Sequence, residues 1–383
     1  MIKNLFVLFY LISLIVCQNK NPVILIHGFL GWGREEMNQY YYWGGRLDYE
    51  TLLRKEGYNV FTVSVGPIST NWDRAIEAFY QIKGGQVDYG IKKSQELNII
   101  QKPINKNYSG LYPQWDQNNP IHIIAHSQGG QTARMLEYLL NESFKEENSK
   151  LLTNKLNGWI QSITTIATPH NGSTLVPIML DLFPFSLNLA PWFGSINNNV
   201  IDNLYNFDLE HWSLNKHPNE SLKTFINRLS KSKLSKSKNL CSWDLSLEGA
   251  KEFNKIYYES NDVYYFSFIT SATNLNPNTL YHKPSSQLSY HLWPTAILMG
   301  KYNQALDNSW YENDGIVNSV SMSHPFGSSV IPLSKNPIKG IWQVKDTLNI
   351  DHQAIIGHGI TLKENSNIFV LYKKHCELLY KLK

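Results

Sequence analysis

Short apolar runs alternate with helix-like segments along most of the chain. The apolar, β-prone runs cover residues 22–27, 58–65, 120–126, 159–168 and 262–270. The run that ends at His126 has little polar alternation, which is typical of a strand buried on both faces. After Ser127, Ala133, Leu136 and Leu140 fall on one helical face. Strands that alternate with helices predict an α/β fold, with a mostly parallel sheet covered by helices on both faces.

The N-terminal segment has a different pattern from the rest of the chain. One lysine precedes an almost wholly apolar run at residues 5–16, and polar residues follow Cys17. This run is long enough for the core of a signal peptide and short for a membrane-spanning helix. A buried N-terminal helix and a lipid anchor at Cys17 are the alternatives. We expect a signal peptide at 1–17, one domain at 18–383, and a protein secreted from the cell or into a digestive vesicle.

Composition narrows the class of protein further. Of the 383 residues, 42% are hydrophobic and 17% are charged, which excludes a disordered or collagen-like chain. The formal net charge is only +4, so we expect no nucleic-acid partner. Without the first 17 residues, Cys241 and Cys376 are the only cysteines. They could form one disulfide in an oxidising compartment, but the sequence leaves their pairing open.

The strongest local motif surrounds Ser127. Ala125-His126-Ser127-Gln128-Gly129 lies between a predicted strand and a predicted helix. A nucleophile elbow needs this context, because a tight turn exposes the serine hydroxyl and the helix N-terminus faces the developing negative charge. Small residues two before and two after the serine let the strand and helix approach closely. We therefore predict that Ser127 is a nucleophile; the alternative is an ordinary turn serine.

A second motif, His27-Gly28-Phe29, ends the first predicted strand. Oxyanion stabilisation in this kind of site uses two backbone N–H groups, one after the nucleophile and one from an early loop. Gln128 and Phe29 are the natural pair. Without the elbow, a plain strand-ending turn would explain the motif equally well.

A serine nucleophile also needs an acid and a histidine, which follow it along the chain in this kind of fold. Asp314 lies at a loop turn, and Asp351-His352 lies late enough for a loop that reaches back over the serine. The histidine accepts the serine proton, and the carboxylate orients the ring. Chain order alone does not choose among His324, His352 and His358.

Several longer stretches resemble one family. The chain is similar to the staphylococcal and Geobacillus group of bacterial lipases in motifs that run in order through nearly all of residues 18–383. The resemblance implies an α/β-hydrolase fold that cleaves lipid esters, with Ser127, Asp314 and His352 as the catalytic triad. It also implies that the amides of Phe29 and Gln128 bind the oxyanion. The matching stretches are 22–37, 42–45, 66–67, 71–75, 122–135, 164–170, 244–246, 312–318 and 351–352.

The same resemblance implies a structural zinc ion held by two aspartates and two histidines. The aspartates match Asp73 and Asp244, but the histidine positions fall on Lys93 and Ile99. Two carboxylates without imidazoles are a poor zinc site. We predict that only remnants of the site survive and that Lys93 lies between the two aspartates as an ion-pair substitute.

The family also has a calcium site, formed by acids shortly after the catalytic histidine. Those positions are Ala354 and Gly359 here, and calcium needs several oxygen ligands. We therefore predict that no metal or other cofactor is needed, and that the enzyme is indifferent to chelators.

A proline-interrupted apolar stretch at 175–193 lies within an expected lid or cap insertion at about 174–225, the region that forms the lid in these lipases. Such a segment covers the site in water and turns its apolar face to lipid. The alternative is a packed cap that never opens. The expected function is hydrolysis of a lipid ester at a lipid–water interface, with transient contact to a membrane or lipid droplet. Triacylglycerol is the default substrate by resemblance. A phospholipase A1 on the same scaffold is the alternative, and a catalytically silent lipid-binding protein is less favoured.

Overall fold

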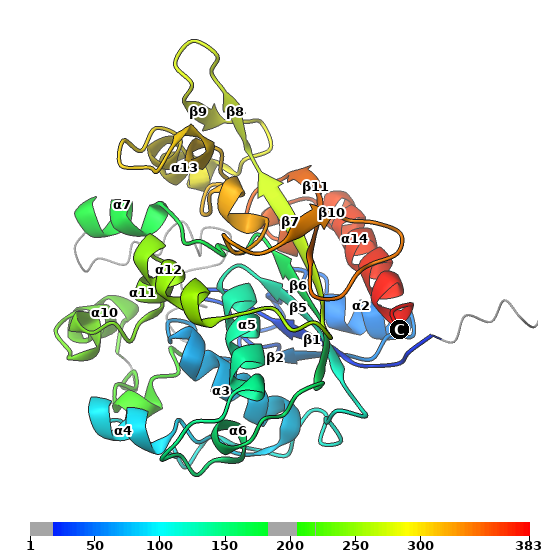
Figure 1. Ribbon diagram of the computed structural model, residues 1–383. Coiled ribbons are helices and arrows are strands. Elements are labelled where there is room, and N and C mark those ends of the chain that lie inside the picture. The colour runs from blue at the N-terminus through cyan, green and yellow to red at the C-terminus, as the bar shows by residue number, and fades with distance from the viewer. Residues whose placement is uncertain (1–17, 183–204, 219) are drawn as a thin grey trace, which may run out of the picture.

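The computed structural model describes residues 18–182, 205–218 and 220–383 (Figure 1). The predicted signal peptide at 1–17 therefore lies outside the described residues. Within the described ranges, no helix is both long and apolar enough to cross a bilayer.

Strands and helices alternate in the first half of the described chain. The strands are β1 (Val23–Ile26), β2 (Val60–Val63), β3 (Gly85–Gln86), β4 (Asn107–Tyr108), β5 (Ile121–His126), β6 (Ile160–Ile166), β7 (Tyr264–Ser271), β8 (Thr273–Leu275), β9 (His282–Pro284), β10 (Val330–Pro332) and β11 (Trp342–Asn349). The α-helices are α2 (Tyr49–Lys55), α3 (Asn71–Lys83), α4 (Ile91–Leu97), α5 (Gln128–Asn141), α6 (Lys150–Thr153), α7 (Leu175–Leu182), α10 (Leu222–Ser230), α11 (Cys241–Asp244), α12 (Leu247–Ile256), α13 (Trp293–Met299) and α14 (Leu362–Tyr380). Short 3₁₀ turns include η1 (Glu210–Trp212) and η3 (Tyr290–Leu292).

The central sheet has seven strands in the order β10-β11-β7-β6-β5-β1-β2. Every neighbouring pair in it is parallel. The prediction of a mostly parallel α/β sheet is thus confirmed. Because the strands are parallel, their carboxyl ends share one edge, and loops that follow them can meet there.

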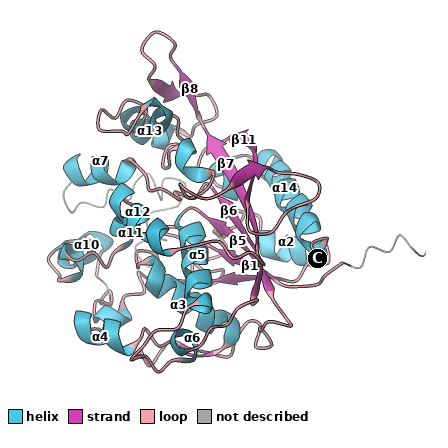
Figure 2. Ribbon diagram, in the orientation of Figure 1, coloured by secondary structure: helices cyan, strands magenta, loops and turns pink. Residues whose placement is uncertain are grey.

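Helices cover both faces of this sheet, as Figure 2 shows. Alternate residues of β1 face opposite layers: Val23 and Leu25 belong to one hydrophobic core, and Ile24 and Ile26 to the other. The first core includes side chains from α2 and α14, and the second includes side chains from α3 and α5. Burial on both faces explains the continuous apolar runs in the central strands.

All five apolar runs form strands of the central sheet, but β10 and β11 were not predicted. The sequence of β11 is Trp-Gln-Val-Lys-Asp-Thr-Leu-Asn, and its second half is largely exposed. A strand that faces solvent for half its length lacks the apolar run on which the prediction depended.

The predicted lid region is described only in part. It begins with α7, whose residues Leu175 and Ile178 are buried in the first core. Residues 183–204 lie outside the described residues. After them, Tyr205, Phe207 and Leu209 return to the same core. Cys241 and Cys376, whose pairing the sequence left open, are separate buried thiols.

Candidate active site

Ser127 lies in a sharp turn between β5 and α5. Its backbone has φ 56° and ψ −130°, a conformation that non-glycine residues rarely adopt. Two glycines let the helix start so close to the sheet. A Cβ on Gly129 would lie 2.4 Å from the Ile26 carbonyl oxygen, and one on Gly130 would lie 2.1 Å from Thr168 Oγ1. The turn is therefore the strained strand–turn–helix geometry that a nucleophile elbow requires.

His352 connects Ser127 to a carboxylate. Its Nε2 is 3.0 Å from Ser127 Oγ, and its Nδ1 is 2.7 Å from Asp314 Oδ2. An ionised carboxylate only accepts hydrogen bonds, so Nδ1 carries the proton and Nε2 is free to accept one from the serine hydroxyl. All three side chains are at most 3% exposed. The structure thus brings together the three residues that the resemblance assigned to the triad.

Asp314 is held by donors on both carboxylate oxygens. Thr270 Oγ1 donates to Oδ2 at 2.6 Å, while the amides of Ile316 and Val317 donate to Oδ1 at 3.1 and 2.8 Å. The amide of His352 also donates to the Asp314 carbonyl oxygen at 3.1 Å. The orientation of the carboxylate is therefore set by fixed donors.

The other two candidate histidines lie elsewhere. His324 Nδ1 is 2.7 Å from Ser323 Oγ. His358 Nε2 lies 2.9 Å from the Tyr42 carbonyl oxygen, and burial lowers the pKa of His358 to about 4. Neither ring bonds Ser127, so the structure separates alternatives that chain order left open.

The loop after β1 runs directly against Ser127. A Cβ on Gly28 would lie only 2.7 Å from Ser127 Cβ, so the backbone that leads to Phe29 passes the nucleophile at contact distance. Gln128 is the first residue of α5, and its side-chain Nε2 donates to the Ser69 carbonyl oxygen at 3.0 Å. Both predicted oxyanion residues thus lie next to Ser127, one in this loop and one at the helix N-terminus.

A buried hydrogen-bond chain, which sequence reasoning missed, ties this loop to His352. The Gly28 amide donates to Tyr42 Oη at 2.8 Å, Tyr42 Oη is 2.6 Å from His126 Nδ1, and His126 Nε2 is 3.0 Å from the His352 carbonyl oxygen. Burial lowers the pKa of His126 well below its usual value, so its ring is neutral. Because a carbonyl only accepts, Nε2 carries the single ring proton and Nδ1 accepts from the Tyr42 hydroxyl.

With this geometry established, comparisons with known proteins identify the family. A family model described as "Lipase-like, C-terminal domain" matches residues 19–374. The chain belongs to this lipase-like family. A lipase from Staphylococcus epidermidis is 34% identical over 359 residues, which cover 90% of this chain and 51% of the relative. The chain therefore spans about half the length of the curated relatives it matches.

Two solved structures of this lipase-like fold are similar over nearly the whole chain. EstA from Clostridium botulinum is 33% identical with a TM-score of 0.86, covering 95% of this chain and 88% of that one. Lipase 1 from Pelosinus fermentans is 35% identical with a TM-score of 0.83, covering 95% of this chain and 100% of that one. These likenesses confirm the predicted α/β-hydrolase fold and the predicted family.

The residues at the family's zinc position do not fit a zinc ion. Lys93 Nζ lies 2.7 Å from Asp73 Oδ1, where an ammonium group donates hydrogen bonds and is no metal ligand. Burial disfavours ionisation of Asp73, but the charge of Lys93 and the neighbouring His211 hold its pKa well below the usual range. Asp244 accepts a hydrogen bond from the Asn71 amide at 2.5 Å, and burial raises the pKa of Asp244 to about 7. Lys93 therefore pairs with Asp73, as predicted, whereas the described residues show no bond between Lys93 and Asp244.

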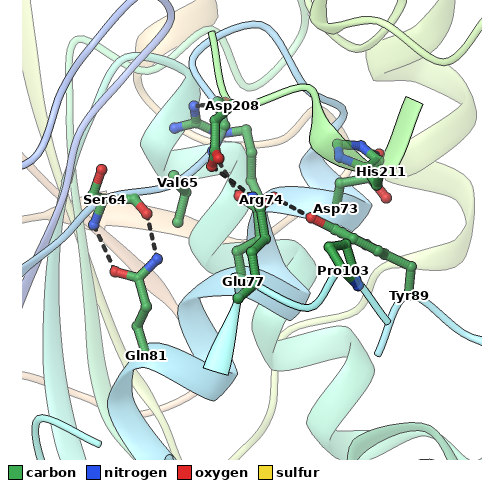
Figure 3. Close-up of polar contacts among 12 residues, drawn as sticks. Ser64, Val65, Asp73, Arg74, Glu77, Gln81, Tyr89, Pro103, Asp208 and His211 are labelled. Carbon is green, nitrogen blue, oxygen red and sulfur yellow. Dashed lines mark hydrogen bonds and ion pairs between the residues drawn. The ribbon is translucent and has the colours of Figure 1, made fainter. Parts of the chain in front are cut away.

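Around this pair, side chains of α3 lie close to Asp208 and His211 of the predicted lid region (Figure 3). His211 Nε2 lies 3.7 Å from Asp73 Oδ2, and its ring stacks on Tyr89 with centroids 4.4 Å apart. Lys106 Nζ bridges Glu77 at 2.8 Å and Asp208 at 2.6 Å. The sequence motifs do not include Lys106, Asp208 or His211. Their contacts could therefore not be predicted from the sequence.

The family's calcium position does not fit calcium either. Ala354 and Gly359 supply no side-chain oxygen, as the sequence already indicated. The nearby Asp351 carboxylate accepts hydrogen bonds from Ser289 and from the amides of Gln353 and Ala354. Its oxygens are thus already used by protein donors.

Proposed function

We propose that the protein is a secreted carboxylic ester hydrolase, specifically a triacylglycerol lipase. The observation that carries this proposal is the Ser127–His352–Asp314 arrangement, with bonds of 3.0 and 2.7 Å, in a nucleophile elbow. Relatives named as lipases support the choice of a lipid ester as substrate.

In the proposed first half-reaction, Ser127 Oγ attacks the ester carbonyl carbon while His352 Nε2 takes the hydroxyl proton. The Asp314 carboxylate stabilises the imidazolium that forms. When the tetrahedral intermediate collapses, the carbon–oxygen bond to the glyceryl alcohol breaks and His352 returns its proton to that oxygen. The acyl group stays on Ser127 as an ester.

The carbonyl oxygen becomes negative in this step and needs preorganised donors. We assign that role to the backbone amides of Phe29 and Gln128. Gln128 opens α5, so the helix dipole adds positive potential at the same point. The close approach of the Gly28 backbone to Ser127 supports the choice of Phe29, in the adjoining loop, as the second donor.

In the second half-reaction, His352 removes a proton from water, which attacks the acyl carbonyl. Collapse of the second intermediate releases the fatty acid and returns the proton to Ser127 Oγ. These steps balance with the side chains and water alone, so the proposal requires no metal or other cofactor.

The decisive experiment is fatty-acid release by the chain without residues 1–17 and by its Ser127→Ala variant. Emulsified triacylglycerol and phosphatidylcholine are compared side by side. We expect release from triacylglycerol that falls at least about a thousandfold in the variant. Preference for phosphatidylcholine would indicate a phospholipase A1. No Ser127-dependent release from either lipid would overturn the proposed function and favour a silent lipid-binding protein.

Secretion is tested separately. Expression of the full chain should deposit protein in the medium or in a vesicle lumen, with a new N-terminus at about residue 18. An intact N-terminus on cell-retained protein would contradict this part of the proposal.

A further inference from the structure

Exposed large apolar side chains gather in one part of the described structure. Between residues 275 and 306 they are Leu275, Leu280, Tyr281, Tyr290, Trp293, Ile297 and Leu306. We call residues 273–306, which contain β8, β9, η3 and α13, the rim lobe. Figure 1 shows the rim lobe projecting past the end of β7, near α7. Soluble proteins rarely expose so many large apolar side chains together unless the surface binds something.

The rim lobe is bonded to the loop that carries His352. Ser289 Oγ donates to Asp351 Oδ2 at 2.6 Å, and His291 Nε2 lies 2.9 Å from Gln353 Oε1. Tyr290 lies between these two anchors and is 82% exposed. The exposed ring is therefore held beside residues that flank the proposed catalytic histidine.

The rim lobe is also bonded to the Asp314 loop and to the predicted lid region. Asn313 Nδ2 donates to the Ala296 carbonyl oxygen of α13 at 3.3 Å. A Cβ on Gly315 would lie 2.9 Å from Leu292 Cβ, so these segments are in close contact. In addition, α13 packs against α7. The rim lobe is thus in contact with elements around the active site.

The hairpin between β8 and β9 keeps an apolar residue where local structure disfavours one. Leu280 has φ 59°, a left-handed conformation that asparagine or glycine adopts more readily, and it is 50% exposed. Within the described structure, this leucine has an unfavourable backbone conformation and a side chain that is only half buried. Residues with strained backbone conformations cluster at functional sites, which is consistent with a role for Leu280 in binding.

The composition of the rim lobe suits a lipid–water interface. Tyr281, Tyr290 and Trp293 combine apolar rings with polar tips, the side-chain type that is enriched where membranes meet water. Between Asp262 and Asp307 the sequence contains no acidic residue. Within that stretch, Lys283 and Lys301 are both exposed. Apolar and positively charged groups together match an anionic lipid surface better than a neutral aqueous one.

We propose that the rim lobe docks the protein on an anionic lipid surface and so presents the active-site edge to its substrate. This inference rests on the proposed function, because it names the surface through which a lipase would reach aggregated lipid. Apolar side chains at Leu280, Tyr290 and Leu306 enter the interface, while Lys283 and Lys301 pair with its anionic groups.

The test measures binding to sedimented vesicles of phosphatidylcholine mixed with phosphatidylglycerol. All proteins carry Ser127→Ala, so that no lipid is hydrolysed during the measurement. The Leu280→Asn/Leu306→Ser variant should bind about tenfold more weakly, because two apolar side chains no longer enter the lipid. The Lys283→Gln/Lys301→Gln variant should bind more weakly, by about tenfold, only when phosphatidylglycerol is present.

A matched control is available on another surface. Ile104, in the segment between α4 and β4, is 87% exposed, so Ile104→Ser removes a highly exposed apolar side chain without touching the rim lobe. It should bind vesicles like the parent protein. Leu280→Asn should also leave the melting temperature unchanged or raise it, because asparagine tolerates φ 59° better than leucine does.

Two results would overturn the inference. One is vesicle binding by the Leu280→Asn/Leu306→Ser variant that equals that of Ile104→Ser. The other is a parent protein that elutes as a dimer and becomes monomeric in the same variant, which would make the rim lobe a self-association surface. Because binding is measured without turnover, either result is independent of whether the Ser127-intact protein hydrolyses triacylglycerol.

Discussion

The ring of His126 donates a hydrogen bond from Nε2 to the carbonyl oxygen of His352, at 3.0 Å. The residue before the proposed nucleophile thus holds the backbone of the proposed general base. Tyr42 continues the chain to Gly28, at the start of the proposed oxyanion loop. Three parts of the site that are far apart in sequence are therefore connected by hydrogen bonds that are all buried.

Replacing Tyr42 by phenylalanine tests this connection. The variant removes the donor to His126 Nδ1 and the acceptor for the Gly28 amide, while it keeps the ring. We expect kcat for a soluble ester to fall by about tenfold with little change in KM, because a lost buried bond costs about 1–3 kcal/mol. Tyr41→Phe is the matched control, since its hydroxyl is not in the chain. Equal activity of both variants would show that the connection has no part in positioning His352.

The elbow was predictable because its signal is local. Ser127 lies between an apolar run and an amphipathic helix, and all three features occur within about twenty residues. Asp314 and His352 carry no such local signal, so the residues alone left His324 and His358 as alternatives. Only the family resemblance assigned them, and the fold then brought them to Ser127.

Contacts between segments that are far apart in the sequence could not be predicted from the sequence. Tyr42 meets His126, and Lys106 meets Asp208, through the way loops pack over the sheet edge. Neither pair follows from periodicity or spacing. The strand β11 was missed for a different reason, because its exposed half has the polar composition of a loop.

The donor from Thr270 to Asp314 gives a second prediction. Thr270→Val keeps the side-chain shape but removes the hydroxyl that donates to Oδ2 at 2.6 Å. Asp314 then orients His352 less firmly, and we expect kcat to fall by about tenfold or more, because a hydrogen bond to a charged group contributes about 1.5–3 kcal/mol. Thr295→Val is a suitable control, because that buried hydroxyl donates only to the Leu292 carbonyl oxygen. A drop of equal size in both variants would assign the effect to packing.

The ion pair of Lys93 with Asp73 predicts how the protein responds to chelators and to substitution. Both side chains are largely buried, with Lys93 15% and Asp73 0% exposed. Lys93→Met leaves the carboxylate without its cation, which should lower the free energy of unfolding by about 3–5 kcal/mol. For the unsubstituted protein, a metal chelator should leave both the melting temperature and ester hydrolysis unchanged. Inactivation by the chelator would contradict the assignment of Lys93 as the substitute.

A variant that introduces the two missing histidines tests whether their absence explains the loss of the zinc site. Lys93→His/Ile99→His places imidazoles at the two positions that the family resemblance assigns to zinc ligands, in addition to the matched Asp73 and Asp244. Zinc prefers such a set of four nitrogen and oxygen ligands. We expect this variant, unlike the parent, to bind zinc in equilibrium dialysis and to melt at a lower temperature with chelator. Lys93→Met is the control for loss of the lysine alone, and zinc binding by the parent protein would count against the interpretation.

Glu137 of α5 predicts a pH dependence of stability. Its carboxyl is buried and accepts hydrogen bonds from the hydroxyls of Tyr257 and Tyr265. Burial raises the pKa of Glu137 from 4.5 to about 7. Between these two values the folded protein keeps a proton that the unfolded chain has lost, so the free energy of unfolding falls as pH rises. The decrease in the free energy of unfolding is complete above pH 7 and amounts to about 3 kcal/mol.

Glu137→Gln removes this titration and keeps the size of the side chain. The variant should therefore become more stable relative to the parent as pH rises from about 4.5 to 7. Above this range the difference in free energy of unfolding should stay constant. Chemical denaturation across this range measures the difference. Glu142→Gln, at the exposed end of the same helix, is the control and should give a difference that does not vary by this amount. A parent-to-variant difference that is flat from pH 4.5 to 8 would mean that Glu137 is already ionised in the folded protein, held so by the tyrosine hydroxyls and by Arg134.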